Sequence, residues 1–243
     1  MAEHAVSASS LPAWLVPALH RGILSRLPEP LVVAVVQGSH RASYSTGAHL
    51  PALEDGPWAM VVLSGALRVF LPSREGDQIT LRYMRPGDII GGFVGAPASL
   101  ARNLNVLETS DLLHLDAVRL ERLARTEAAL AFEMLNEASR VLRLAHRAYS
   151  LRAFGSIRVR VANAILERAA ARGEIAPNTV VPGTQHELAV AAGTVREVVA
   201  SAIQGLKRDE IVDVKRGALV IIDPARLVHE ADGGAGFWPP PTG

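Results

Sequence analysis

The side chains with the most specific chemistry lie close together, between residues 184 and 216. Arg196 and Glu197 are adjacent. A guanidinium can pair with O6 and N7 of guanine, and a carboxylate can accept a hydrogen bond from N4 of cytosine. Lys215 and Arg216 lie farther along and carry the positive charge that phosphate contacts require. Side chains of these types are chemically suited to contact the bases and the phosphates of DNA.

Two four-residue motifs of the form Thr-x-x-Glu predict the helices that carry these side chains. Thr184 to Glu187 and Thr194 to Glu197 each fit a capping box, in which the Thr hydroxyl accepts from a free backbone N–H and the Glu reaches back. We therefore expect helices over 185–191 and 195–207. A tight turn at Gly193 joins them, because the absence of a Cβ permits a positive φ. The following VDVKRGALVII predicts a basic β-hairpin.

Two helices joined by a short glycine turn, with a basic hairpin directly after, favour a winged helix-turn-helix whose second helix enters the DNA major groove. The alternative is an ordinary αα-corner, since capping boxes occur in all classes of protein. Glu197 also has two possible roles, either a base or Arg196-orienting contact or capping alone. Side chains at helix N-termini suit phosphate contacts. The candidate DNA contacts are Thr184, Gln185, Thr194, Val195, Arg196, Glu197, Ser201, Lys215 and Arg216.

Residues 126–152 contain no Pro or Gly and predict one long helix. At 1.5 Å per residue this helix would be roughly 40 Å long. Its apolar residues recur at alternating spacings of three and four, which is a heptad pattern and predicts a coiled-coil dimer. The alternative is an amphipathic helix that lies on its own domain. The candidate dimer contacts are Ala131, Leu135, Ala138, Leu142, Ala145 and Tyr149. Gly155 suits a left-handed helix end, and Ser156 suits the cap of a further helix that ends at Gly173.

The N-terminal half has a different pattern of apolar and turn residues. Residues 10–26 have helical spacing broken by prolines, and from about 31 to 116 short Val-, Ile- and Leu-rich runs alternate with turn residues. Runs such as LVVAVVQGSH, SGALRVFLP and NLNVLETSDLLHLD therefore predict strands of a roll, sandwich or barrel, with SREGDQ as a hairpin tip. The predicted fold is α+β. Residues 1–125 form a β-rich domain (a roll, sandwich or barrel) with an N-terminal helix, followed by a dimerisation helix and hinge at 126–154, a winged helix-turn-helix at 155–229 and a disordered tail at 230–243.

Composition excludes several classes of protein. The 243 residues include no Cys, which excludes disulfides, iron–sulfur clusters and thiolate metal sites. No run of 18 apolar residues predicts a membrane span, and MAEHAVSASS does not resemble a signal peptide, so we expect a cytoplasmic protein. The eight His residues include no pair four apart and no His-x-His. This argues against haem and against a cupin-like metalloenzyme, the alternative from a different class, and we expect no enzyme activity and no metal.

The stretch TQHELAVAAGTVREVVASAIQGLKRDEIV resembles the DNA-binding signature of the Crp/Fnr regulators, without a gap. SGALRVF, PGDIIGG and Arg102 are similar to that family's cyclic-nucleotide-binding roll, and the long helix is similar to its dimer helix. The resemblance implies a homodimer on a pseudo-palindromic double-stranded DNA operator, with RNA polymerase as a further partner. It also implies that Arg196 and Glu197 read bases. Ser201 replaces a second base-reading arginine, so the preferred DNA site should differ.

The roll departs from the family's ligand site. The resemblance implies that a glutamate holds the ribose and an arginine the cyclic phosphate; here Gly92 replaces the glutamate, Asn103 replaces a serine, and Ala145 and His146 occupy the adenine-contacting positions. We therefore do not expect cyclic AMP to bind in the usual way. Two alternatives stay open, another anionic ligand held by Arg102, or no small molecule at all. The candidate effector-pocket residues are Gly91, Gly92, Phe93, Arg102, Asn103, Ala145 and His146.

Overall fold

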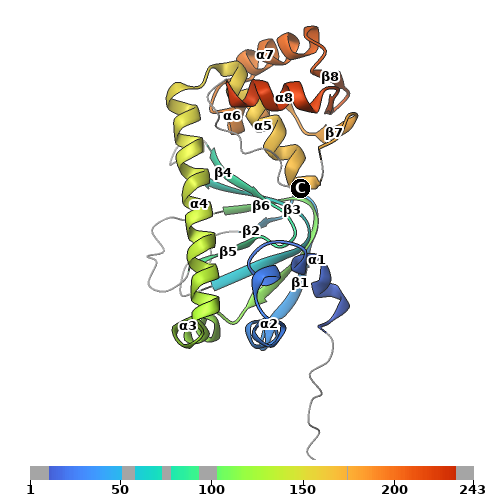
Figure 1. The fold of residues 1–243 in the computed structure, drawn as a ribbon. Helices are drawn as coiled ribbons and strands as arrows, with labels where there is room; N and C mark the ends of the chain where they lie inside the picture. The colour runs from blue at the N-terminus through green and yellow to red at the C-terminus, as the bar shows by residue number, and fades with distance from the viewer. Residues whose placement is uncertain (1–10, 51–57, 73–77, 93–102, 174, 234–243) are drawn as a thin grey trace, which may run out of the picture.

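A computed structural model describes residues 11–50, 58–72, 78–92, 103–173 and 175–233 of the chain. An N-terminal roll of strands lies at one end of the molecule and a cluster of helices with a small sheet lies at the other (Figure 1). A single long helix, α4 (Ala128–Phe154), runs along the side of the roll and leads to the second cluster. No helix within the described ranges is long and apolar enough to cross a membrane.

The roll is built on a 6-stranded antiparallel sheet in the order β1-β6-β3-β4, with β2 paired to β6 and β5 paired to β3. The central strands β3 (Trp58–Pro72) and β6 (Asn103–Leu115) are the longest. The others are β1 (His40–Tyr44), β2 (His49–Leu50), β4 (Gln78–Met84) and β5 (Ile89–Gly92). The β3–β4 pairing confirms the predicted hairpin, while its tip lies outside the described residues.

Successive residues of β3 face two different cores, as the two-residue period of a strand requires. Val61 and Leu63 join a cluster that the N-terminal helices and α4 complete, whereas Met60 and Val62 face the interior of the roll. Both cores are almost entirely aliphatic. A strand with two buried faces is a near-continuous apolar run, which explains why AMVVL shows no polar alternation.

The helices before the sheet correct one prediction. η1 (Ala13–Leu15), α1 (Val16–Leu19) and η2 (Leu24–Arg26) confirm short helices near the N-terminus. LVVAVV, however, is not a strand, because it forms most of α2 (Glu29–Val36). A short apolar run fits either structure by periodicity. Proline in the first turn starts the helix, and Val32 and Val35 then bury one face against the sheet core.

The junction at residues 154–157 is partly as expected. α3 (Ala117–Thr126) and α4 confirm the two helices that follow the roll, and α5 (Ile157–Arg172) confirms the next one. The Ser156 hydroxyl accepts from the backbone N–H of Val159, as a cap should. The prediction for Gly155 is wrong, since its φ is −72° and not left-handed. A Cβ at Gly155 would instead lie 2.5 Å from the Leu151 carbonyl oxygen, so the glycine permits a close approach.

The C-terminal module combines four helices with a small sheet in the order β7-β9-β8. Its elements are α5, β7 (Thr179–Pro182), α6 (Gln185–Ala192), α7 (Arg196–Arg208), β8 (Val212–Lys215), β9 (Ala218–Ile221) and α8 (Pro224–Asp232). α8 was not predicted. Since it extends through residues 230–232, the prediction that a disordered tail begins at residue 230 is wrong. Residues 234–243 lie outside the described ranges.

Candidate DNA interface

The helix-turn-helix begins with the predicted capping box. The backbone N–H of Glu187 donates to the Thr184 hydroxyl at 3.2 Å, and the Thr184 N–H donates to the Glu187 carboxylate at 2.7 Å. α6 then ends at Gly193, whose φ of 64° is left-handed, as the turn requires. Leu188, Ala189 and Ala192 of α6 are buried against the module's core, which fixes how α6 supports α7.

The second capping box is absent, which corrects the prediction for Thr194. α7 starts at Arg196, so Val195 is its cap residue and has no side-chain oxygen to cap it. Glu197 then stands at the second helical position, whereas a capping box needs the carboxylate at the third. Without this role, the Glu197 side chain is available for a contact outside the module, one of the two roles that the sequence left open.

The two faces of α7 have opposite character. Val199, Ile203 and Leu206 are fully buried in the core of the module. Arg196 and Glu197, the predicted base contacts, are exposed, and so is Ser201, a further candidate DNA contact. In the part of the chain that the structure describes, Arg196 makes no ion pair, whereas Lys207 near the end of the same helix is paired with Asp213 at 2.8 Å. The start of α7 therefore presents an unneutralised guanidinium and a carboxylate to solvent.

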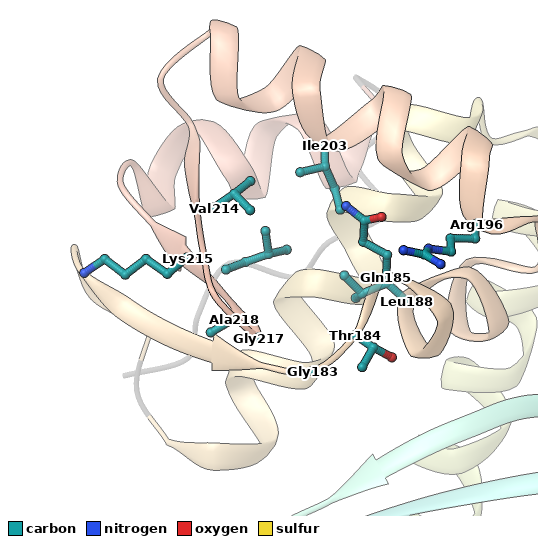
Figure 2. A pocket seen from close by; sticks show the side chains of 11 residues that line it. Gly183, Thr184, Gln185, Leu188, Arg196, Ile203, Val214, Lys215, Gly217 and Ala218 are labelled. Carbon is teal, nitrogen blue, oxygen red and sulfur yellow. The ribbon is translucent and has the colours of Figure 1, made fainter.

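A hollow joins the beginning of α7 to the basic hairpin. Its lining comes from the start of α6, from α7 and from both strands of the hairpin, and Figure 2 shows Gln185 and Arg196 on one side and Lys215 reaching outward on the other. Lys215 and Arg216 are exposed, and Gly217 with a φ of 74° makes the tight turn between β8 and β9. The predicted hairpin is confirmed, and its Lys215 lines the same hollow as Arg196. The hollow is lined by Gly183, Thr184, Gln185, Leu188, Arg196, Ile203, Val214, Lys215, Gly217, Ala218 and Leu219.

Arg168 of α5 contacts the residues that begin α6, and this contact was not predicted from the sequence. Its guanidinium is buried, donates to the Glu187 carboxylate at 3.2 Å, and occupies the space beside Gly183, where a Cβ would lie 2.5 Å from it. Although burial alone raises the pKa of Glu187, the hydrogen bonds from Thr184 and the positive charge of Arg168 lower it overall. Glu187 is therefore held in its charged form at the helix start.

The C-terminal module also contacts the roll through the far end of α5. Arg172 forms an ion pair with Glu108 of β6, and its guanidinium also reaches the Leu107 carbonyl. Arg85, which follows β4, donates to the Ala170 carbonyl at 3.2 Å. The module is thus attached to the roll at this contact as well as through the chain at Gly155.

The predicted dimer residues form an exposed apolar stripe on α4. We call Ala131, Leu135, Ala138, Leu142, Ala145 and Tyr149 the seam. Leu135, Leu142 and Tyr149 are 63%, 55% and 75% exposed, while Ala131 is half-buried and Ala138 and Ala145 are exposed. The alternative, in which this stripe lies on its own roll, is wrong, because Leu130 and Glu137 on another face of α4 are the residues buried there.

Buried ion pairs fix the inner face of α4 to the roll. The Glu137 carboxylate receives two hydrogen bonds from Arg140 and lies 3.5 Å from Arg82 of β4. Arg140 also lies 3.3 Å from Asp88, which Arg21 of the N-terminal segment approaches at 3.4 Å. The orientation of α4 about its own axis is therefore fixed, with the seam turned outward.

The predicted effector pocket is only partly visible. Phe93 and Arg102 lie outside the described residues, and Gly92 ends β5. Gly91 has a structural reason to be glycine, because a Cβ there would lie 2.3 Å from the Trp58 carbonyl oxygen of the paired strand. Asn103 begins β6 opposite Phe70. Ala145 and His146 are exposed on α4. The described ranges contain no group of three or more His, Asp or Glu that could hold a metal ion.

Comparisons with known proteins agree with this geometry. A family model for the Crp-like helix-turn-helix domain matches residues 159–230. The chain is 30% identical over 174 residues to the transcriptional regulator SdrP of Thermus thermophilus, spanning 70% of this chain and 82% of SdrP. It is 28% identical to the cyclic AMP receptor protein of the same organism, covering 71% of this chain and 79% of that protein.

Solved structures share the whole architecture. A Crp/Fnr-family transcriptional regulator from Thermus thermophilus superposes with a TM-score of 0.65 at 25% identity, covering 79% of this chain and 98% of that one. A putative regulator of the same family from Eubacterium rectale gives a TM-score of 0.68 at 18% identity, covering 87% and 98%. The predicted fold class, a β-roll followed by a long helix and a winged helix-turn-helix, is confirmed.

Proposed function

Because this chain belongs to the Crp/Fnr family of transcription regulators and carries that family's helix-turn-helix DNA-binding domain, we propose that it binds a pseudo-palindromic operator as a homodimer. In this proposal Arg196 and Glu197 contact base edges in the major groove, and Lys215 and Arg216 contact phosphates beside it. The relatives are transcription regulators, and the proposal accordingly assigns no catalytic activity. It includes RNA polymerase as a partner and a cytoplasmic location.

The division of α7 into two faces is the observation that carries the base-reading assignment. The buried face fixes the helix in the module, and the exposed leading end carries Arg196 and Glu197 without a capping role for the carboxylate. A charged side chain that is exposed and unpaired keeps its full capacity for a bidentate contact with guanine. Lys215 of the hairpin lines the same hollow as Arg196, where phosphates would flank a bound groove. Thr184, Gln185 and Thr194 would add phosphate contacts, and Ser201 would add a short polar contact one turn farther along α7.

The exposed seam supports the dimer. Contiguous apolar surface on a helix that already buries its other face requires a partner of matching shape, and small residues at alternating positions allow two copies of α4 to approach closely. Two recognition helices would then lie about one turn of DNA apart, ~34 Å, on the two half-sites.

For the roll, we propose no cyclic AMP site of the usual kind. Ala145 has no side-chain group to hydrogen-bond a base, and Gly92, at the position of the glutamate that would hold the ribose, has no side chain to accept a hydrogen bond. An anionic effector held by Arg102 is the second candidate. A thermal-shift series with cyclic AMP, cyclic GMP and inorganic anions tests both, since a stabilisation by cyclic AMP at micromolar concentration would contradict the first statement.

The DNA-binding proposal is tested by selection from randomised duplexes followed by gel-shift titration. The wild-type chain should enrich a two-fold symmetric sequence. Arg196→Ala should lose the preference for that sequence while it retains weak, salt-sensitive binding to any duplex, and Arg208→Ala at the other end of α7 is the matched control. An equal loss of affinity on selected and random DNA for Arg196→Ala would contradict the base-reading role.

A further inference from the structure

Val195 is an exposed apolar residue at the leading end of the recognition helix. It precedes Arg196 directly, its side chain contributes nothing to the core of the module, and the residue is 60% exposed. Its neighbours toward the DNA side, Arg196 and Glu197, are charged and exposed. An isolated apolar residue within a polar surface is common in proteins, so exposure alone decides nothing.

The exposure of Val195 is informative because of its position at the start of α7. It is the cap residue of α7, where Ser, Thr, Asn or Asp would accept a hydrogen bond from a free N–H of the first turn. A cap residue without such an oxygen leaves that N–H without a capping hydrogen bond and so lowers the stability of the helix. Thr194, which could serve as a cap, stands one residue too early. The chain therefore carries a β-branched apolar side chain at a position where local stability favours a small polar one.

The major groove offers one apolar group to such a side chain. Base edges present hydrogen-bond donors and acceptors, together with the C5-methyl group of thymine. We propose that Val195 contacts a thymine methyl in each half-site, next to the guanine that Arg196 contacts, and so specifies thymine at that position. This inference rests on the proposed function, because it requires the start of α7 to lie in the major groove.

Deoxyuridine provides a direct test, because it pairs as thymine does but lacks the methyl group. Each thymine of the selected operator is replaced in turn by deoxyuridine, and affinities are measured for the full-length wild-type chain, Val195→Ser and Val195→Thr. One methyl group contributes about 0.8 kcal/mol when buried, which corresponds to about a fourfold loss of affinity for one half-site and about fifteenfold for both. Val195→Ser should bind the thymine and deoxyuridine operators equally, and Val195→Thr, which keeps one methyl, should retain part of the difference.

Both variants restore a capping hydroxyl, so each should melt at or above the wild-type temperature. Val33→Ser, at an exposed valine of α2, controls for the loss of an apolar side chain elsewhere. The inference is overturned if no thymine of the operator shows a methyl effect in the wild type, or if the effect persists unchanged in Val195→Ser. A selection that enriches no sequence overturns the proposed function itself and the inference with it, which separates the two failures.

Discussion

Leu142→Asp should separate the proposed dimer into monomers. Leu142 lies in the middle of the seam and is 55% exposed in the single chain, so about half of its surface is still available for burial by a partner. In a two-fold symmetric pair the same residue is buried twice. The substitution therefore removes two apolar contacts and introduces two carboxylates into an apolar interface.

The magnitude follows from the exposed fraction. Full burial of a leucine side chain contributes about 1.5–3 kcal/mol, so burial of about half contributes about 0.8–1.5 kcal/mol per chain and about 1.5–3 kcal/mol per dimer. At a factor of ten for each 1.4 kcal/mol, the dimer should dissociate at about 10- to 150-fold higher concentration from this loss alone. Desolvation of the two carboxylates adds to the loss.

Sedimentation equilibrium over a wide range of concentrations measures the change. Val33→Asp is the matched control, because it introduces the same charge at an exposed valine of α2, outside the seam, and should leave the dimer intact. A Leu142→Asp chain with the wild-type dissociation constant would refute the assignment of the seam. Monomers with unchanged affinity for a full operator would refute the claim that two copies bind together.

Three further predictions follow from the C-terminal module. Lys215→Ala should weaken binding to all duplexes alike and reduce the slope of log affinity against log salt by about 2, since one phosphate contact is lost in each chain of the dimer; unequal losses on selected and random DNA would contradict this. Thr184→Ala should lower the free energy of unfolding by about 1 kcal/mol, whereas Thr194→Ala, which removes no cap, should change it by less than about 0.5 kcal/mol in urea titrations. Because the folded pKa of Glu187 is lowered, its contribution is present above the ordinary glutamate pKa and is lost as the pH falls through the folded value. Acid unfolding monitored by circular dichroism should thus show a smaller loss of stability in Glu187→Gln than in the wild type, and identical pH profiles would count against the role of Arg168.

Much of the C-terminal module could be predicted because its signals are local. The Thr184–Glu187 box and Gly193 each depend on residues within one turn, and both are confirmed. α8 was missed although it too has local signals, an Asp223-Pro224 start and a left-handed Gly233 at its end. The helix was missed because its apolar residues, Leu227, Val228 and Ala231, are too few to show a clear helical period.

The errors arise where identical local patterns allow two structures. LVVAVV has the composition of a buried strand, and only the packing of Val32 and Val35 against the sheet makes it a helix. The second Thr-x-x-Glu motif matches the first in form, but α7 begins one residue later than this motif predicts. Glu197 therefore occupies the second helical position and not the third. In both cases the local pattern fits two structures, and packing against residues distant in sequence determines which of them forms.

Contacts between distant arginines and carboxylates could not be predicted at all. Arg168 with Glu187, and Arg82 with Glu137, join elements whose relative placement is set by the whole fold. Sequence spacing contains no signal for such pairs. The seam, by contrast, repeats within one helix, so its exposed residues could be identified from the heptad pattern alone.

The contacts between the C-terminal module and the rest of the chain have a mechanical consequence. They follow α5 from the chain connection at Gly155, through the hydrogen bond of 2.7 Å from Arg147 of α4 to Asn163, to Ala170 and Arg172 at the last turn, roughly 24 Å along a 16-residue helix. α6 also contacts β4 of the roll, away from this line. A rotation of the module about the axis of α5 would therefore preserve most of the contacts along α5 but would break the one between α6 and β4. In the proposed dimer, such a rotation would change the tilt of the two recognition helices together with the distance between them.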